Sequence, residues 1–118
     1  MDNLVNRENI AKTIGTNPAL IKKIITLYFR DAPKLLEEVE EAIKEVDNKK
    51  LAEKAHALKG ITSYYNIDTV YNMCLKLEQL GKASSLPEKN EEITNSLTEL
   101  KDMLTLLIEQ LKVYNEQL

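Results

Sequence analysis

Apolar residues recur every three or four positions along most of this chain, which is the spacing of one face of an α-helix. Stripes of this kind predict helices over 33–46, 49–65, 68–80 and 86–114. In the last of these the apolar positions alternate by four and three, as in the seam of an antiparallel bundle: Ile93, Leu97, Leu100, Leu104, Leu107, Leu111 and Tyr114. The sequence therefore predicts an all-α fold, an antiparallel up-down-up-down four-helix bundle.

The first 30 residues predict one or two additional N-terminal helices that cover an end or a side of the bundle. Residues 3–14 form a weakly amphipathic stretch that ends at Gly15. Asn17 and Pro18 then have the chemistry of an N-cap and a first helical residue, so a second helix should run to about Arg30. It is apolar on two stripes, of which the second consists of Leu20, Ile24 and Leu27.

Three signals set the remaining boundaries. Asp31-Ala32-Pro33 predicts a break or a kink, because proline lacks the backbone N–H that a helix interior needs. Asn66 tolerates the left-handed backbone that ends a helix. Ser85-Leu86-Pro87-Glu88 has the pattern of a capping box for the last helix. The chain is expected to be a single domain, with the core bundle at about 33–114 and the covering helices at about 3–30.

Composition narrows the functional classes. Three glycines and three prolines among 118 residues agree with an all-helical protein, and a net charge of −3 makes nucleic acid an unexpected partner. One cysteine cannot form an internal disulfide, and the N-terminal residues lack a signal-peptide pattern, so we expect a cytoplasmic protein. No apolar run is long enough for a membrane span. A single histidine and a single cysteine cannot supply a structural zinc site. Carboxylate metal sites stay open but no motif supports one, so no metal ligands are predicted.

The segment 54–60 holds the only histidine of the chain, His56. Residues three and four positions apart on a helix are neighbours on its surface, so Lys59 and Gly60 share a face with His56. This face lies at the edge of the apolar stripe, and we expect the imidazole to be exposed. A nucleophilic nitrogen, a positive charge and a position without a side chain are thus brought together.

This combination suits a carrier of phosphoryl groups. A neutral imidazole can attack phosphorus and hold the phosphoryl group as a phosphoramidate, and Lys59 can stabilise the phosphoryl oxygens as a point charge. Gly60 and the small Ala52 leave room for a partner's active site, and Ser63 can form a hydrogen bond with that partner. Spacing alone also allows simpler interpretations: a surface His56 without chemistry, a solvated Lys59, and a Gly60 that marks close helix packing.

The segment 55–60, Ala-His-Ala-Leu-Lys-Gly, resembles the motif of the histidine-containing phosphotransfer (HPt) domains of two-component phosphorelays. The resemblance covers about residues 15–112. Further positions that carry it are Leu27-Tyr28-Phe29, Pro33, Leu51-Ala52, Val70, Cys74, Leu77-Glu78 and Gly81. The sequence departs from the family at Ile61 and Thr62, where small residues are usual, and at Asn66, where a glycine is usual.

The resemblance implies that His56 is the phosphoacceptor, that Lys59 stabilises the phosphoryl group, and that Gly60 gives a receiver domain access to the ring. Implied partners are the receiver domains of response regulators and of a hybrid histidine kinase, which a monomer would bind through the His56 face and the stripe of Leu20, Ile24 and Leu27. The chain itself is expected to bind no cofactor, and Mg²⁺ is expected from the partner receiver domain.

We therefore predict a phosphocarrier without kinase or phosphatase activity of its own. It would accept a phosphoryl group on His56 from one receiver aspartate and pass it to another. The alternative is a non-phosphorylated helical adaptor that binds receiver or kinase domains. A kinase dimerisation domain fits less well, because 57–60 is Ala-Leu-Lys-Gly where such a domain has an acid and then a proline.

Overall fold

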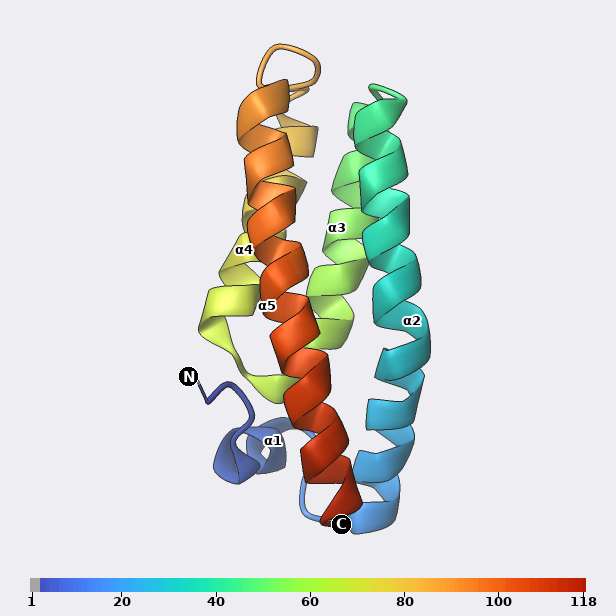
Figure 1. Ribbon diagram of the computed structural model, residues 1–118, viewed down its shortest axis with the longest axis vertical. Helices are drawn as coiled ribbons and strands as arrows, with labels where there is room; N and C mark the ends of the chain where they lie inside the picture. The colour runs from blue at the N-terminus through green and yellow to red at the C-terminus, as the bar shows by residue number, and fades with distance from the viewer. Residues whose placement is uncertain (1–2) are drawn as a thin grey trace.

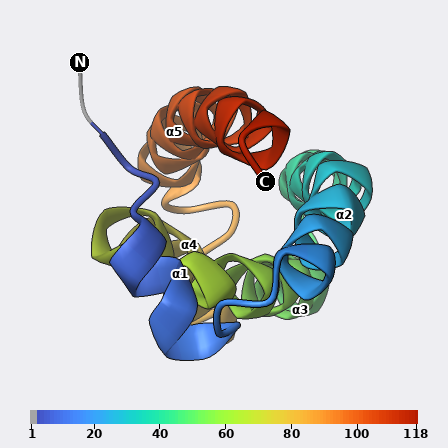
Figure 2. The ribbon, with the colours of Figure 1, turned by 90° about the horizontal axis from the view of Figure 1, so that it is seen from below.

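A computed structural model describes residues 3–118 and contains a bundle of four long helices with one short helix before it (Figure 1). The bundle helices are α2 (Pro18–Lys44), α3 (Asn48–Thr62), α4 (Asp68–Lys82) and α5 (Asn90–Glu116). They run alternately up and down, and seen from below they surround a common centre (Figure 2). The predicted all-α bundle is confirmed.

The predicted apolar stripes form the core. On α5, the residues from Ile93 to Leu111 that alternate by four and three are all buried. The α3 stripe contributes Leu51, Ala55 and Leu58, each at most 1% exposed. None of the helices in the described part of the chain is long and apolar enough to cross a bilayer.

The predicted break at Pro33 is wrong, because α2 is one helix of 27 residues with Pro33 inside it. Pro33 lies on the exposed side of α2, where the carbonyl that loses its N–H partner can face water. On the other side, Tyr28, Ala32 and Val39 are buried in the core on both sides of the proline. Core packing thus continues across the site of the missing hydrogen bond. Residues 18–30 are therefore the first half of a bundle helix and not a covering helix.

A single short helix, α1 (Arg7–Thr13), precedes the bundle and packs against η1 (Ser63–Tyr65), the 3₁₀ turn that follows α3. Ile10 is fully buried at this contact with the core. Asn66 adopts the predicted left-handed conformation, with φ 53° and ψ 47°, and its side-chain amide donates to the carbonyl oxygen of Asn9. The segment before the bundle therefore covers the η1 end of α3.

The predicted N-cap is confirmed for α2 and is wrong for α5. Asn17 caps α2 as predicted, since its side chain accepts from the backbone N–H groups of residues 19 and 20. The predicted capping box at Ser85 is wrong: α5 begins at Asn90, and its cap, Lys89, makes no side-chain hydrogen bond there. Residues 85–89 instead form a turn, in which Asn48 exchanges two hydrogen bonds with the backbone of Leu86. A tertiary contact to α3 replaces the local cap.

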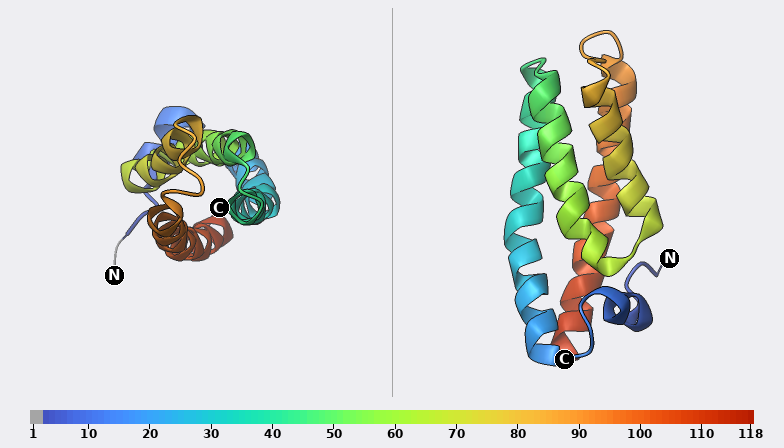
Figure 3. Two further views of the ribbon diagram at one scale, coloured as in Figure 1. Left: turned by 90° about the horizontal axis from the view of Figure 1, so that it is seen from above. Right: turned by 180° about the vertical axis from the view of Figure 1, so that it is seen from behind.

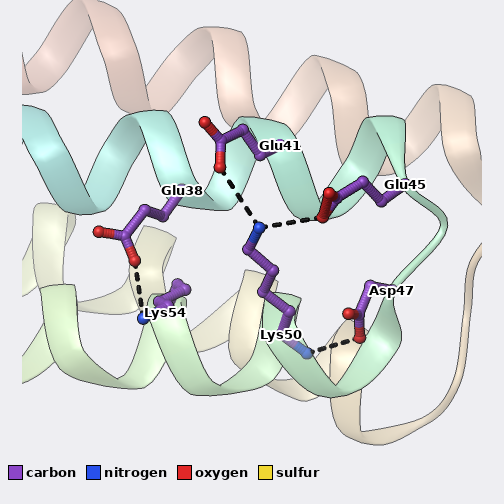
Figure 4. Close-up of polar contacts among 6 residues, drawn as sticks. All are labelled: Glu38, Glu41, Glu45, Asp47, Lys50 and Lys54. Atoms are coloured by element: carbon purple, nitrogen blue, oxygen red, sulfur yellow. Dashed lines mark hydrogen bonds and ion pairs between the residues drawn. The ribbon is translucent and has the colours of Figure 1, made fainter.

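Ion pairs on the surface connect α2 to α3 (Figure 4). The ammonium group of Lys50 lies 3.3 Å from a carboxylate oxygen of Glu41 and 2.9 Å from one of Glu45. One turn further along, Lys54 pairs with Glu38 at 2.7 Å. These side chains extend across the outside of the bundle, on the side of α3 that faces α2.

Candidate functional site

His56 lies in the middle of α3 with 67% of its side chain exposed. Ala55 and Leu58 on the same helix are buried, so the register that puts them in the core turns His56 to its edge. The helices α3 and α4 lie side by side as an antiparallel hairpin (Figure 3, right), and the face of His56 is directed toward α4. The sequence-based expectation of an exposed ring agrees with this geometry.

The ring is held by a carboxylate from α4. His56 Nδ1 lies 2.9 Å from Oε2 of Glu78, whose side chain is only 2% exposed. An ionised carboxylate can only accept hydrogen bonds, so Nδ1 must be the protonated nitrogen that donates. In the neutral imidazole the other nitrogen, Nε2, then keeps its lone pair. Glu78 thus selects the tautomer in which Nε2 carries the lone pair.

Glu78 is surrounded by three nitrogen donors. Burial by itself raises the pKa of this carboxyl, but hydrogen bonds from Lys59, Lys82 and His56 outweigh burial and lower the pKa to about 2. Lys59 Nζ lies 2.7 Å from Oε1, and Lys82 Nζ lies 2.9 Å from Oε2. The carboxylate therefore stays ionised at neutral pH, which is the state that the His56 contact requires.

Lys59 is less available than the sequence suggested. Its side chain is 14% exposed, its ammonium group contacts Glu78, and it also lies 5.6 Å from the ring centroid of Tyr71. The hydrogen bond to Glu78 raises the pKa of Lys59, so the group is a permanent cation near neutral pH. Its position one turn after His56 is as predicted, but in this structure its charge is directed at Glu78.

The two glycines near the site have opposite surroundings. A Cβ atom added to Gly60 would meet nothing within 4 Å, so this exposed position is open to solvent. A Cβ atom added to Gly81 would lie 2.7 Å from the backbone nitrogen of Ala52 and 2.9 Å from the carbonyl oxygen of Asn48. Gly81 thus allows α4 to approach the backbone of α3. Close packing explains Gly81 and does not explain Gly60.

The other candidate docking residues lie at several places. Ala52 is half-buried where α3 meets Gly81, and the hydroxyl of Ser63 donates to the carbonyl oxygen of Gly60 at 2.6 Å. Leu20 is 44% exposed on α2. Ile24 and Leu27 line a hollow of about 180 Å³ between α2 and the end of α3, whose other lining residues are Tyr28, Asp31, Ile61, Tyr64 and Tyr65. The sequence did not predict this hollow.

Sequence reasoning missed the roles of Glu78 and Lys82. In the sequence, Glu78 stands out only as one of the positions that carry the family resemblance. A signal was present: Glu78 interrupts the apolar stripe of α4, and it lies 12 residues after Asn66, while His56 lies 10 residues before it. Residues at similar distances from the turn of an antiparallel helix pair lie opposite each other. Lys82, four residues after Glu78, follows from the same register.

No cluster that could hold a metal ion, with at least three His, Cys, Asp or Glu side chains, occurs within residues 3–118. Glu78 is the carboxylate that contacts His56, and its oxygens are already engaged by two lysines and the ring. Such a site does not suit Mg²⁺, which binds through free carboxylate oxygens and water.

A bundle with an exposed histidine midway along one helix defines a class of proteins, and comparison with known proteins agrees with it. The family model described as Hpt domain matches residues 23–110. The chain belongs to this family, whose members are phosphocarriers of phosphorelays and not kinases or phosphatases.

One curated relative is the sensor protein TorS of Escherichia coli (strain K12). It is 32% identical over 94 residues, which make up 80% of this chain and 10% of TorS. The chain thus spans about a tenth of the length of that relative. No solved structure gives a significant match.

Proposed function

We propose that this protein is a phosphorelay intermediate, which accepts a phosphoryl group on Nε2 of His56 from a receiver-domain aspartate and passes it to the aspartate of another receiver. The observation that carries the proposal is the exposed ring whose Nδ1 is bound to a buried carboxylate. A ring fixed in this way presents one nitrogen, in a known tautomer, to an approaching partner.

The transfer needs little from the carrier beyond positioning and charge stabilisation. The Nε2 lone pair forms a bond to phosphorus as the bond from phosphorus to the aspartyl oxygen breaks, and the aspartate leaves as a carboxylate. The proton on Nδ1 stays in place, so the phosphorylated ring becomes cationic, and the carboxylate of Glu78 stabilises that charge. Transfer to the next receiver is the reverse of these bond changes.

Receiver docking would use the His56 face together with apolar surface on α2. Gly60 leaves the approach to the ring open, Ser63 lies one turn further, and Ala52 lies one turn before His56. On α2, Leu20, Ile24 and Leu27 offer apolar surface, and the last two line a hollow together with Ile61 and Tyr64. Mg²⁺ would come from the acidic residues of the receiver.

A phosphotransfer assay tests the proposal. A receiver domain phosphorylated with a small phosphodonor is mixed with wild type, with His56→Gln, or with a second variant such as Lys76→Met that leaves the site intact. We expect label on wild type and Lys76→Met and none on His56→Gln, with the circular-dichroism melting curve of His56→Gln showing an intact fold. Labelling of His56→Gln would refute the assignment of the phosphoacceptor.

The phosphotransfer assay and a binding measurement together separate a carrier from an adaptor. Calorimetric titration of a receiver with wild type and His56→Ala measures binding apart from chemistry. An adaptor predicts binding without labelling in either protein, whereas the carrier predicts labelling of the wild type alone.

A further inference from the structure

The two carboxylate oxygens of Glu78 contact different numbers of nitrogen groups. Oε1 pairs with Lys59, at 2.7 Å, whereas Oε2 accepts both the ring N–H of His56 and the ammonium group of Lys82, each at 2.9 Å. Because both nitrogens contact one oxygen atom, they are at most twice 2.9 Å apart. Lys82 is thus a second cation beside the reactive ring.

The side chains of Lys59 and Lys82 differ in how far they are exposed to solvent. Lys59 has a side chain that is 14% exposed, between Glu78 and the ring of Tyr71. Lys82 has a side chain that is 66% exposed, on the last turn of α4. A lysine ammonium is a point charge on a flexible four-carbon stem, so an exposed lysine can change partners at low cost. Lys82 can therefore move, and Lys59 is held.

Phosphorylation of His56 would change how strongly His56 and Lys82 each interact with Oε2 of Glu78. Under the proposed function, the ring becomes cationic when Nε2 is phosphorylated, and its N–H then makes a stronger, charge-assisted hydrogen bond to Glu78. At the same time a phosphoryl group with negative oxygens appears on the far side of the ring. The ammonium group of Lys82, which also contacts Oε2, then has a second anion nearby, the phosphoryl group. Its own interaction with Glu78 weakens at the same time.

We propose, on the basis of the proposed function, that Lys82 is the cation that moves to the phosphoryl group on His56, and that Lys59 instead keeps Glu78 in place. The resemblance to the family assigned phosphoryl stabilisation to Lys59. The contacts divide that task between two residues: Lys59 positions the carboxylate that orients the ring, and Lys82 neutralises the charge that arrives.

The test compares wild type with Lys82→Met, Lys82→Arg and Lys59→Met, with Lys76→Met as the matched control. Lys76 also lies on α4 with an exposed side chain, and it pairs with Glu92 away from the site. Each protein is phosphorylated by a receiver, and the phosphoryl group is titrated by ³¹P NMR. A nearby cation favours the more negative form of a phosphoryl group, so Lys82→Met should raise the pKa of that group. A lysine with only a structural role would not affect this titration.

Transfer rates give the second measurement. Loss of an exposed charge pair of this kind corresponds to about a two- to fivefold slower transfer. We expect this in Lys82→Met, recovery in Lys82→Arg, and no change in Lys76→Met. The melting curves of all five proteins check that the fold is retained.

Two outcomes would overturn the inference, and they are distinct from failure of the proposed function. If Lys82→Met titrates and transfers like Lys76→Met, Lys82 does not contact the phosphoryl group. If Lys59→Met alone shifts the phosphoryl titration, the task belongs to Lys59. If the wild type itself takes up no phosphoryl group, the proposed function fails, and the role of Lys82 fails with it.

Discussion

Two sets of lysine–glutamate contacts lie on either side of α3, one toward α2 and one toward α4. Toward α2, Lys54 pairs with Glu38, which is 21% exposed, and Lys50 pairs with Glu41 and Glu45, which are 52% and 57% exposed (Figure 4). Toward α4, Lys59 and Lys82 pair with a carboxylate that is 2% exposed. The residue types are the same, and the surroundings of the carboxylate differ.

The burial of the carboxylate decides whether a set of lysine–glutamate contacts can fix the geometry of its partners. A carboxylate in water exchanges partners freely, so exposed pairs contribute little to stability and fix no geometry. An enclosed carboxylate must keep enough partners to balance its charge, because a buried charge without them is costly. The α4 side therefore holds a histidine ring in one orientation, whereas the α2 side only connects two helices. Four substitutions test this comparison.

Gly81→Ala should have the largest effect. The added Cβ would lie 2.7 Å from the backbone nitrogen of Ala52, and backbone atoms cannot turn aside as a flexible side chain can. We expect a loss of about 2–3 kcal/mol in the free energy of unfolding, after allowance for the better helix propensity of alanine. Urea unfolding measures it. Unchanged stability would mean that α3 and α4 are not held in close contact.

Glu78→Gln should come next, with a loss of about 1–2 kcal/mol at pH 7 from charge-assisted hydrogen bonds. The pKa of Glu78 in the folded protein is lowered to about 2, below its ordinary value in the unfolded chain. Its contribution is therefore fully present above about pH 5 and is lost as the pH falls toward 2. The stabilities of wild type and variant, measured by urea unfolding at several pH values, should converge over that range. A constant difference would argue against an ionised Glu78.

Gly60→Ala should have a smaller effect of opposite sign. Nothing lies within 4 Å of the added Cβ, and alanine favours a helix interior by up to about 1 kcal/mol, so the free energy of unfolding should rise by about 0.5–1 kcal/mol. The same methyl group narrows the approach to His56, so transfer from a receiver should slow. Unfolding and transfer assays on one preparation check both. A more stable variant with undiminished transfer would show that access to His56 does not depend on a glycine at position 60.

Lys54→Met should have the smallest effect. The substitution keeps most of the side-chain stem and removes an ion pair whose side chains are 34% and 21% exposed, far more than that of Glu78, so the change should stay within about 0.5 kcal/mol. It should also shrink with added salt, because exposed charges are screened. Unfolding at low and high ionic strength measures it. A loss as large as that of Glu78→Gln would remove the difference between the two sides of α3.

Much of the molecule follows from local patterns. The apolar stripes of α3, α4 and α5, the Asn17 cap and the left-handed Asn66 depend on residues near one another in the chain, and the structure agrees with each. The neighbours of His56 on its own helix also follow from spacing alone. Local chemistry could therefore place the exposed imidazole beside Lys59 and Gly60.

Pro33 and Ser85 show where local patterns are insufficient. Their chemistry favours a helix break and a helix cap, yet α2 continues through Pro33, and Ser85 lies in a turn. In the first case the buried residues on both sides of the proline hold one helix together. In the second, Asn48 from another helix binds the backbone of the turn. Contacts distant in sequence outweigh the local preference in both.

By itself, the sequence determined the all-helical bundle and the exposed histidine, since both arise from residues within a few positions of one another. Only the tertiary structure decided that Glu78 holds the ring and that Lys59 and Lys82 share its two oxygens. These contacts join helices on opposite sides of a turn, and their geometry is set by how closely Gly81 lets the two backbones approach. Spacing along one helix contains no information about that distance.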